Sequence, residues 1–146
     1  MARSSEAKLV FPQLAEFYGW APEFGYLLLR LTAGGCWLYH GWGKLMGGAA
    51  PVIASLTRSA IPLPTVSAYI IMFLETVGAV AIILGLFTRF FAAAIAIELA
   101  VIAFWVQMPQ GFPRMELFLF WGVAMFFIAL RGGGPYSLDR KIGKEL

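Results

Sequence analysis

The stretch LLLRLTAGGCWLYHGWGKLM, residues 27–46, decides how the rest of the chain is interpreted. It is apolar enough to lie in a membrane, yet it contains Arg30, His40 and Lys44. At about 100° per residue, Trp37 and Lys44 fall within about 40° of Arg30 on a helix, and His40 falls within about 80°. A cation at membrane depth is costly and usually faces a partner inside a bundle. The stretch therefore predicts a membrane helix with one polar flank.

Two carboxylates further along the chain are candidate partners for these cations. Glu75 and Glu98 each lie near the middle of a long apolar run that contains no other charge. We therefore expect Arg30, Glu75 and Glu98 to form a buried ionic cluster inside a helical bundle. Such a cluster can serve only to fix which helices pack together, or it can line a site for a polar head group.

The composition is typical of a membrane protein. Of the 146 residues, 60% are hydrophobic and only 13% are charged, and the mean hydropathy is +0.78. A soluble domain averages about 25% charged residues. The net charge of +3 is too small to indicate nucleic acid as a partner. The sequence therefore predicts an all-α integral membrane protein whose main surroundings are the lipid bilayer.

The chain has few residues that could hold a cofactor by themselves. Cys36 is its only cysteine, which excludes an intramolecular disulfide and a CxxC pair. His40 is its only histidine, which excludes bis-histidine haem ligation. We expect no intrinsic cofactor and no metal site.

Four long apolar runs predict a four-helix bundle within residues 24–131. The predicted crossings cover about residues 24–42, 66–86, 90–107 and 115–130. We expect residues 1–23 to form an N-terminal cytoplasmic or interfacial segment, and residues 132–146 to form a cytoplasmic C-terminal tail.

Basic residues outside the predicted crossings indicate the orientation. Three of them fall on one side of the membrane: Lys44, Arg58 and Arg114. Seven fall on the side shared by both termini: Arg3, Lys8, Arg89, Arg131, Arg140, Lys141 and Lys144. Because Lys and Arg concentrate in cytoplasmic loops, this bias predicts that both termini are cytoplasmic.

Polar residues near the ends of these runs are candidate helix caps, because their side chains can accept hydrogen bonds from free backbone N–H groups. Thr65 or Ser67 fits the start of the second crossing, and Thr88 fits the start of the third. Ser137 fits the start of a short basic helix that continues through Lys144.

Several motifs, taken together, resemble the DoxX family over about residues 24–140. They are Arg30-Leu and Tyr39-His-Gly-Trp-Gly-Lys44-Leu, then Ser59-Ala-Ile-Pro-Leu-Pro, then Glu75 with Gly78 and Leu84-Gly-Leu-Phe-Thr-Arg89, and finally Gly134-Pro-Tyr-Ser-Leu-Asp139. The resemblance implies a four-helix protein of a bacterial-type inner membrane. Relatives are linked to quinone-coupled sulfur oxidation, to terminal oxidase assemblies and to a complex that handles oxidative and thiol stress.

The resemblance implies a small subunit of a quinone-linked redox complex, an accessory subunit rather than an independent enzyme. Other membrane or peripheral redox subunits are then the expected partners, and a homo-oligomer is also compatible with the sequence. A quinone needs donors for its carbonyls and a carboxylate to supply protons. The candidate ligand-binding residues are Arg30, Trp37, Tyr39, His40, Trp42, Lys44, Glu75 and Glu98. A non-catalytic scaffold that recruits or stabilises a partner enzyme, and a small-solute carrier, are the alternatives.

Overall fold

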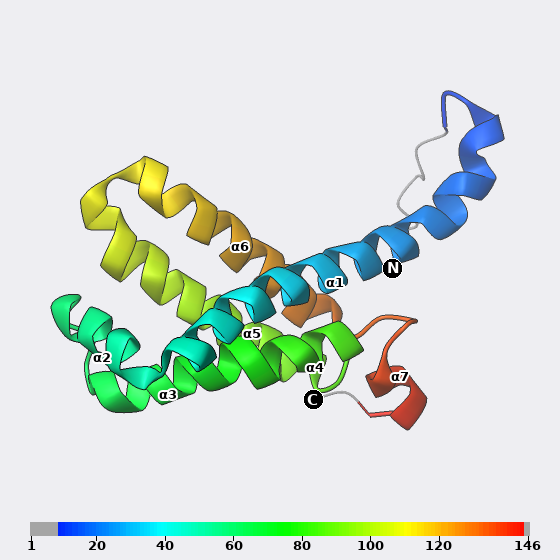
Figure 1. The fold of residues 1–146 in the computed structure, drawn as a ribbon. Helices are drawn as coiled ribbons and strands as arrows, with labels where there is room; N and C mark the ends of the chain where they lie inside the picture. The colour runs from blue at the N-terminus through cyan, green and yellow to red at the C-terminus, as the bar shows by residue number, and fades with distance from the viewer. Residues whose placement is uncertain (1–8, 145–146) are drawn as a thin grey trace, which may run out of the picture.

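The computed structural model describes residues 9–144, and this part of the chain is all-helical (Figure 1). The first long helix, α1, covers Ala15–Gly47 and follows a short 3-10 turn, Pro12–Leu14. Its first six residues are exposed and extend beyond the other helices (Figure 1). The boundary expected after residue 23 therefore falls inside a continuous helix rather than between two elements.

Three further helices are long and apolar enough to cross a membrane: Pro64–Leu84, Thr88–Gln110 and Phe112–Arg131. They agree closely with the second, third and fourth predicted crossings. The helix α1 is not among them, because Arg30, His40 and Lys44 interrupt its apolar sequence. The length and composition of the helices thus support three crossings, and a fourth crossing by α1 stays a prediction.

Two of these long helices contain a π-helical segment near the middle or the end. Pro64–Leu84 consists of α3 (Pro64–Phe73), the π segment Leu74–Gly78 and α4 (Ala79–Leu84). Thr88–Gln110 consists of α5 (Thr88–Val101), the π segment Ile102–Gln107 and the 3-10 turn Met108–Gln110. The last long helix, Phe112–Arg131, is α6. Two short helices complete the fold, namely α2 (Ala49–Arg58) and α7 (Leu138–Ile142).

The helix ends confirm one of the predicted caps and correct two others. The side chain of Ser137 accepts a hydrogen bond from the backbone N–H of Arg140 at 3.2 Å and so caps α7. At the start of α3 neither Thr65 nor Ser67 is the cap, because Pro64 already occupies the first helical position. Thr88 is likewise the first residue of α5 rather than its cap.

The long helices pack as neighbours in the order α1, α3–α4, α5 and α6. Glycines of α1 allow the first contact to be close: a Cβ added to Gly41 would overlap the backbone of Glu75, and one added to Gly34 would lie 2.7 Å from Ile83. At the other end of α1, Tyr26 donates a hydrogen bond to the carbonyl of Gly132, just beyond α6. These contacts place α1 antiparallel to α3–α4.

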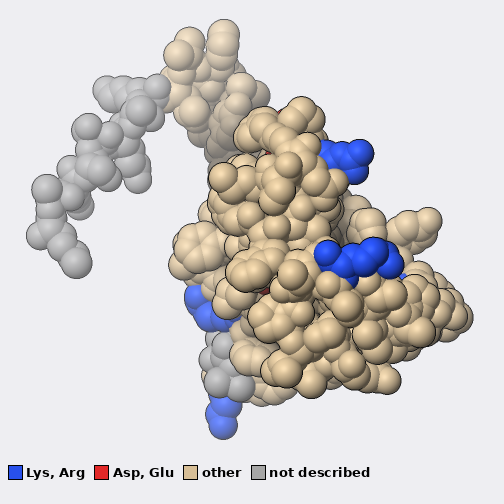
Figure 2. Space-filling model, turned by 90° about the vertical axis from the view of Figure 1, so that its left-hand side faces the viewer, with Lys and Arg blue, Asp and Glu red and all other residues tan. Residues whose placement is uncertain are grey.

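The outer surface is mostly uncharged. Figure 2 shows one face of the molecule, on which side chains other than Lys, Arg, Asp and Glu predominate and the basic residues form separate patches. Large apolar side chains such as Phe90 on α5 and Phe120 and Leu130 on α6 are 60–70% exposed. Such a surface is suited to contact with lipid.

Candidate functional site

An ion pair joins the end of α1 to the π segment Leu74–Gly78, which lies near the middle of the helix Pro64–Leu84. Lys44, in the last turn of α1, donates to a carboxylate oxygen of Glu75. The side chain of Glu75 is only 2% exposed, whereas that of Lys44 is 33% exposed. Gly41, one turn before Lys44, lets the helix backbone approach Glu75 closely. Since π segments frequently occur at functional sites, the position of Glu75 within one is informative.

Glu98 on α5 adds a second carboxyl to this ion pair. It is 8% exposed, and its carboxyl lies beside that of Glu75. No N–H or hydroxyl group of the described residues donates to either oxygen of Glu98 or to the second oxygen of Glu75, and the one hydrogen bond of Glu98 is with the Glu75 carboxyl. We call Lys44, Glu75 and Glu98 the central polar group. Its two carboxyls are matched by one ammonium, so its polar atoms are incompletely paired.

The two carboxyls of the central polar group lie far from the ends of their own helices. Glu98 is ten residues beyond Thr88, and Glu75 is nine residues before Leu84. At 1.5 Å per residue, each carboxylate is therefore about 14–15 Å from the turn that joins the two helices. That distance corresponds to the middle of an apolar layer about 30 Å thick.

Glu98 also lines an apolar groove between α2, α3 and α5 with a volume of about 370 Å³. Most of the lining is aliphatic and includes Leu56, Ile70, Ile71, Ala94, Ile97 and Val101. Among the described residues that line this groove, Glu98 is the only charged one. We call this hollow the Glu98 groove. The carboxyl oxygens of Glu98 are buried, so this side chain would turn toward the groove to make a polar contact with an amphipathic molecule there.

Near the Glu98 groove, a side-chain hydrogen bond that the sequence did not predict holds two segments of the chain together. The indole N–H of Trp105 donates to the carbonyl of Ser59 at 3.1 Å. This bond connects the segment between α2 and α3 with the π segment Ile102–Gln107.

Among residues 9–144, no three His, Cys, Asp or Glu side chains lie together as a metal site would require.

Arg30 is not part of the central polar group, which corrects the expected cluster with Glu75 and Glu98. It is 2% exposed and donates to the carbonyls of Gly133 and, at 2.6 Å, Tyr136. The reason is distance: Arg30 precedes Lys44 by fourteen residues, or about 21 Å along a helix. The cation that meets Glu75 is Lys44.

Arg30 instead belongs to a second polar region, at the end of the bundle where α4 and α6 end and α5 begins (Figure 1). There Asp139 accepts from the backbone N–H of Phe87 at 2.7 Å, the backbone N–H of Thr88 at 3.0 Å and the Thr88 hydroxyl at 2.7 Å. Asp139 therefore caps α5 from a distant part of the chain. We call Tyr26, Arg30, Thr88, Asp139 and the backbone of residues 132–136 the terminal polar layer.

Three of the remaining predicted site residues are exposed rather than buried in the central polar group: Tyr39, His40 and Trp42. Tyr39 is 80% exposed and Trp42 is 57% exposed. His40 is also exposed, with its ring centroid 5.6 Å from that of Trp37 and 6.0 Å from that of Tyr39. Trp37 is buried, and its indole nitrogen has no acceptor. Of the eight candidates, the structure therefore unites Lys44, Glu75 and Glu98.

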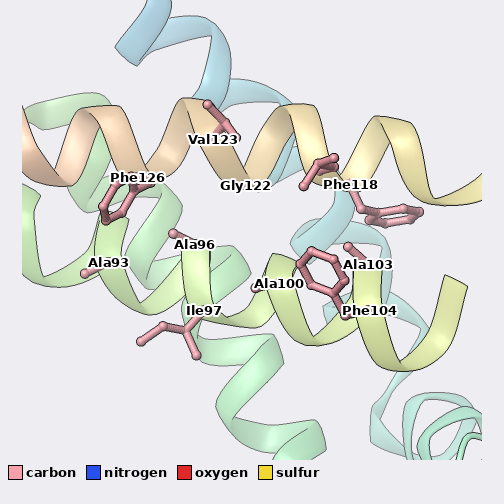
Figure 3. Close-up of a pocket in the computed structure, with 11 residues that line it drawn as sticks. Ala93, Ala96, Ile97, Ala100, Ala103, Phe104, Phe118, Gly122, Val123 and Phe126 are labelled. Carbon is pink, nitrogen blue, oxygen red and sulfur yellow. The ribbon is translucent and has the colours of Figure 1, made fainter. Parts of the chain in front are cut away.

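A second groove, of about 380 Å³, lies between α5 and α6. Figure 3 shows small side chains such as Ala96 and Ala100 on one wall and the rings of Phe104, Phe118 and Phe126 around it. Its described lining residues are all apolar. It can therefore accommodate hydrocarbon, but it offers no side chain with which to recognise a polar group.

The fold and its apolar helices define an all-helical membrane protein. The DoxX family model matches residues 25–108, more than half of the chain, and the chain belongs to the DoxX family. The matched range includes Lys44, Glu75 and Glu98, whereas Asp139 lies outside it. Comparisons with curated proteins and with solved structures gave no significant match.

Proposed function

We propose that this protein is a small accessory subunit of a quinone-linked redox complex in a bacterial-type inner membrane, and that it binds quinone in the Glu98 groove. The observation that carries the proposal is Glu98, the one charged residue among the described residues that line this groove, whose buried carboxyl meets only the carboxyl of Glu75. A buried polar group without a partner is costly, so it favours a ligand that completes its hydrogen bonds.

The chemistry of a quinone suits this arrangement. Its ring and isoprenoid tail are apolar, and its two ring oxygens are the only groups that need polar partners. A quinol hydroxyl would donate to the Glu98 carboxylate, whereas a quinone carbonyl would accept from the protonated carboxyl. Reduction of a quinone takes two electrons and two protons. In this proposal a partner redox subunit supplies both electrons, and Glu98 passes the two protons one at a time, being reprotonated from the aqueous side after each transfer, so that the quinone leaves as quinol.

We further propose that α1 crosses the membrane as a fourth helix and that both termini are cytoplasmic. Of the basic residues on the proposed cytoplasmic side, Arg89, Arg131, Arg140, Lys141 and Lys144 are described, and Arg3 and Lys8 lie outside the described residues. The test uses Cys36→Ser protein that carries either Lys141→Cys or Ser55→Cys. Ser55→Cys should react with an impermeant thiol reagent in intact cells and Lys141→Cys should not, and the reverse result would overturn the orientation.

The quinone proposal is tested by measuring quinone bound to protein purified from native membranes in mild detergent. Ala94→Phe fills the Glu98 groove, whereas Ala93→Phe places the same ring in the groove between α5 and α6. Glu98→Gln removes the carboxylate, and Glu116→Gln is the matched control on the exposed side of α6. Mass spectrometry should find several-fold less quinone per chain in Ala94→Phe and Glu98→Gln, with both controls retaining it.

The same preparation separates this proposal from its alternatives. Quinone retained in Ala94→Phe would show that the Glu98 groove is not the site. A stoichiometric partner enzyme without quinone in the wild-type preparation would favour the scaffold. Solute flux through the pure protein in liposomes, lost in Glu98→Gln, would favour the carrier.

A further inference from the structure

A basic hollow of about 460 Å³ lies beside the terminal polar layer, outside the Glu98 groove. Its lining includes four cationic residues from three segments of the chain: Arg89, Arg131, Arg140 and Lys144. It also includes two acidic residues, Glu23 and Asp139. Four positive and two negative charges leave a formal charge of 4 − 2 = +2 around the hollow.

The two acidic residues are largely engaged within the protein. Both oxygens of Asp139 accept hydrogen bonds from Phe87 and Thr88 at the start of α5. One oxygen of Glu23 pairs with Arg131 at 2.5 Å, and its other oxygen is buried without a partner. Arg140 and Lys144, in contrast, are exposed. The hollow therefore presents its cations to a ligand more readily than its carboxylates.

Two of the cations are held in fixed positions at the ends of apolar helices. Arg89, the second residue of α5, donates to the carbonyls of Ala129 at 3.2 Å and Leu130 at 2.5 Å, near the end of α6. Arg131 is the last residue of α6, and its guanidinium lies 4.5 Å from the centre of the Tyr26 ring. Because both helices are long enough to cross a membrane, their ends lie at the depth of lipid head groups.

We propose that this hollow binds the phosphate group of an anionic phospholipid. Basic pockets at the ends of membrane helices attract such head groups, and a guanidinium can donate two parallel hydrogen bonds to a phosphate. Arg131 and Arg89 would border the phosphate from the membrane side, and Arg140 and Lys144 would close over it from α7 and the residues that follow. This site depends on membrane insertion but not on the proposed quinone site.

The test measures how many anionic and zwitterionic phospholipids the purified chain retains, by native mass spectrometry after exchange into mixed lipid–detergent micelles. Wild type should retain phosphatidylglycerol over phosphatidylcholine. Arg140→Gln with Lys144→Gln removes two lining cations and should weaken this retention about tenfold or more. Lys141→Gln with Arg114→Gln removes the same charge from exposed positions outside the hollow and should change it less than about twofold.

A third variant gives a change in the opposite direction. Glu23→Gln removes the carboxylate that competes for Arg131, so it should increase retention of phosphatidylglycerol. An unchanged or lower retention in Glu23→Gln would contradict the site. Equal losses in the two double variants would overturn it in favour of general attraction to a basic surface. Inorganic phosphate that displaces phosphatidylglycerol at equal concentration would identify a site for free phosphate and overturn the lipid proposal.

Discussion

The terminal polar layer and the central polar group are both buried among apolar helices, yet they differ in how completely their polar atoms are paired. In the terminal polar layer, both oxygens of Asp139 accept hydrogen bonds, and two nitrogens of Arg30 donate to carbonyls. Among the buried side-chain atoms described in this layer, only the Nε of Arg30 is left without a partner. In the central polar group, no described N–H or hydroxyl group donates to either oxygen of Glu98 or to one oxygen of Glu75, and the Glu98 carboxyl meets only that of Glu75. The difference separates polar residues that hold the fold from polar residues that are available to a ligand.

This difference has an energetic consequence that mutations can test. Removing one member of a largely paired network leaves its partners buried and unpaired, which costs more than the net contribution of each bond. Removing a group that has no partner relieves a desolvation cost instead. Substitutions in the terminal polar layer should therefore destabilise the protein, and substitution of Glu98 should not.

The largest effect is expected for Arg30→Met. It removes two charge-assisted hydrogen bonds, each worth about 1.5–3 kcal/mol, and leaves the carbonyls of Gly133 and Tyr136 without donors. The free energy of unfolding in detergent should fall by about 3–5 kcal/mol. Arg114→Met, at an exposed position, is the control and should stay within about 0.5 kcal/mol of wild type. If Glu75→Gln restores the stability of Arg30→Met, the separation of the two polar regions is wrong.

A smaller loss is expected for Asp139→Ala. The substitution removes the cap of α5 and three accepted hydrogen bonds. A lost cap costs about 0.5–2 kcal/mol, and the buried donors that it leaves add to this, so we expect about 2–3 kcal/mol. Ser137→Ala, which removes only the cap of α7, should cost about 1 kcal/mol. Chemical unfolding of both variants gives the comparison, and equal losses would show that Asp139 has no special part in joining α7 to α5.

Lys44→Met should lower the free energy of unfolding by about 2 kcal/mol, somewhat less than Asp139→Ala. A broken buried pair typically costs about 3–5 kcal/mol, and the exposure of one third of the Lys44 side chain reduces this value. Adding Glu75→Gln should restore most of the loss, because the unpaired carboxylate is then absent. Additive losses in the double variant would mean that the two side chains do not interact in the membrane-embedded protein.

The sequence alone predicted the helical class well, because long apolar runs bounded by Gly and Pro leave few other structures open to a chain in lipid. The expected runs near residues 66–86, 90–107 and 115–130 match the three apolar helices that the structure contains. Glu75 and Glu98 were also identified correctly as neighbours, since a lone carboxylate in an apolar helix needs a polar neighbour. The interruption of two helices by π segments left no sequence signal that we recognised.

The sequence could not assign the cations to their partners. Arg30 and Lys44 share one flank of α1, so helical periodicity treats them as equivalent, and only the register of α1 against α3–α4 separates them. That register follows from the close approach at Gly34 and Gly41, which is a three-dimensional property. The role of Asp139 was missed for a similar reason, because it caps a helix that starts 51 residues earlier in the chain.

The smallest expected effect on stability concerns Glu98→Leu. Its sign decides whether Glu98 is a residue that holds the fold or one that is available to a ligand. The Glu98 carboxyl meets only that of Glu75, which already accepts from Lys44, so an apolar side chain of similar size should pack there at lower free energy. In quinone-depleted protein, which avoids stabilisation by ligand, we expect the free energy of unfolding to rise by about 0.5–1.5 kcal/mol. Bound quinone should fall in the same variant.

A gain in stability together with a loss of ligand would mark Glu98 as a residue kept for function at the expense of the fold. A loss of more than about 2 kcal/mol, with quinone binding retained, would show that Glu98 stabilises the fold as Arg30 and Asp139 do. The contrast between the two polar regions would then disappear, and with it the main support for a ligand in the Glu98 groove.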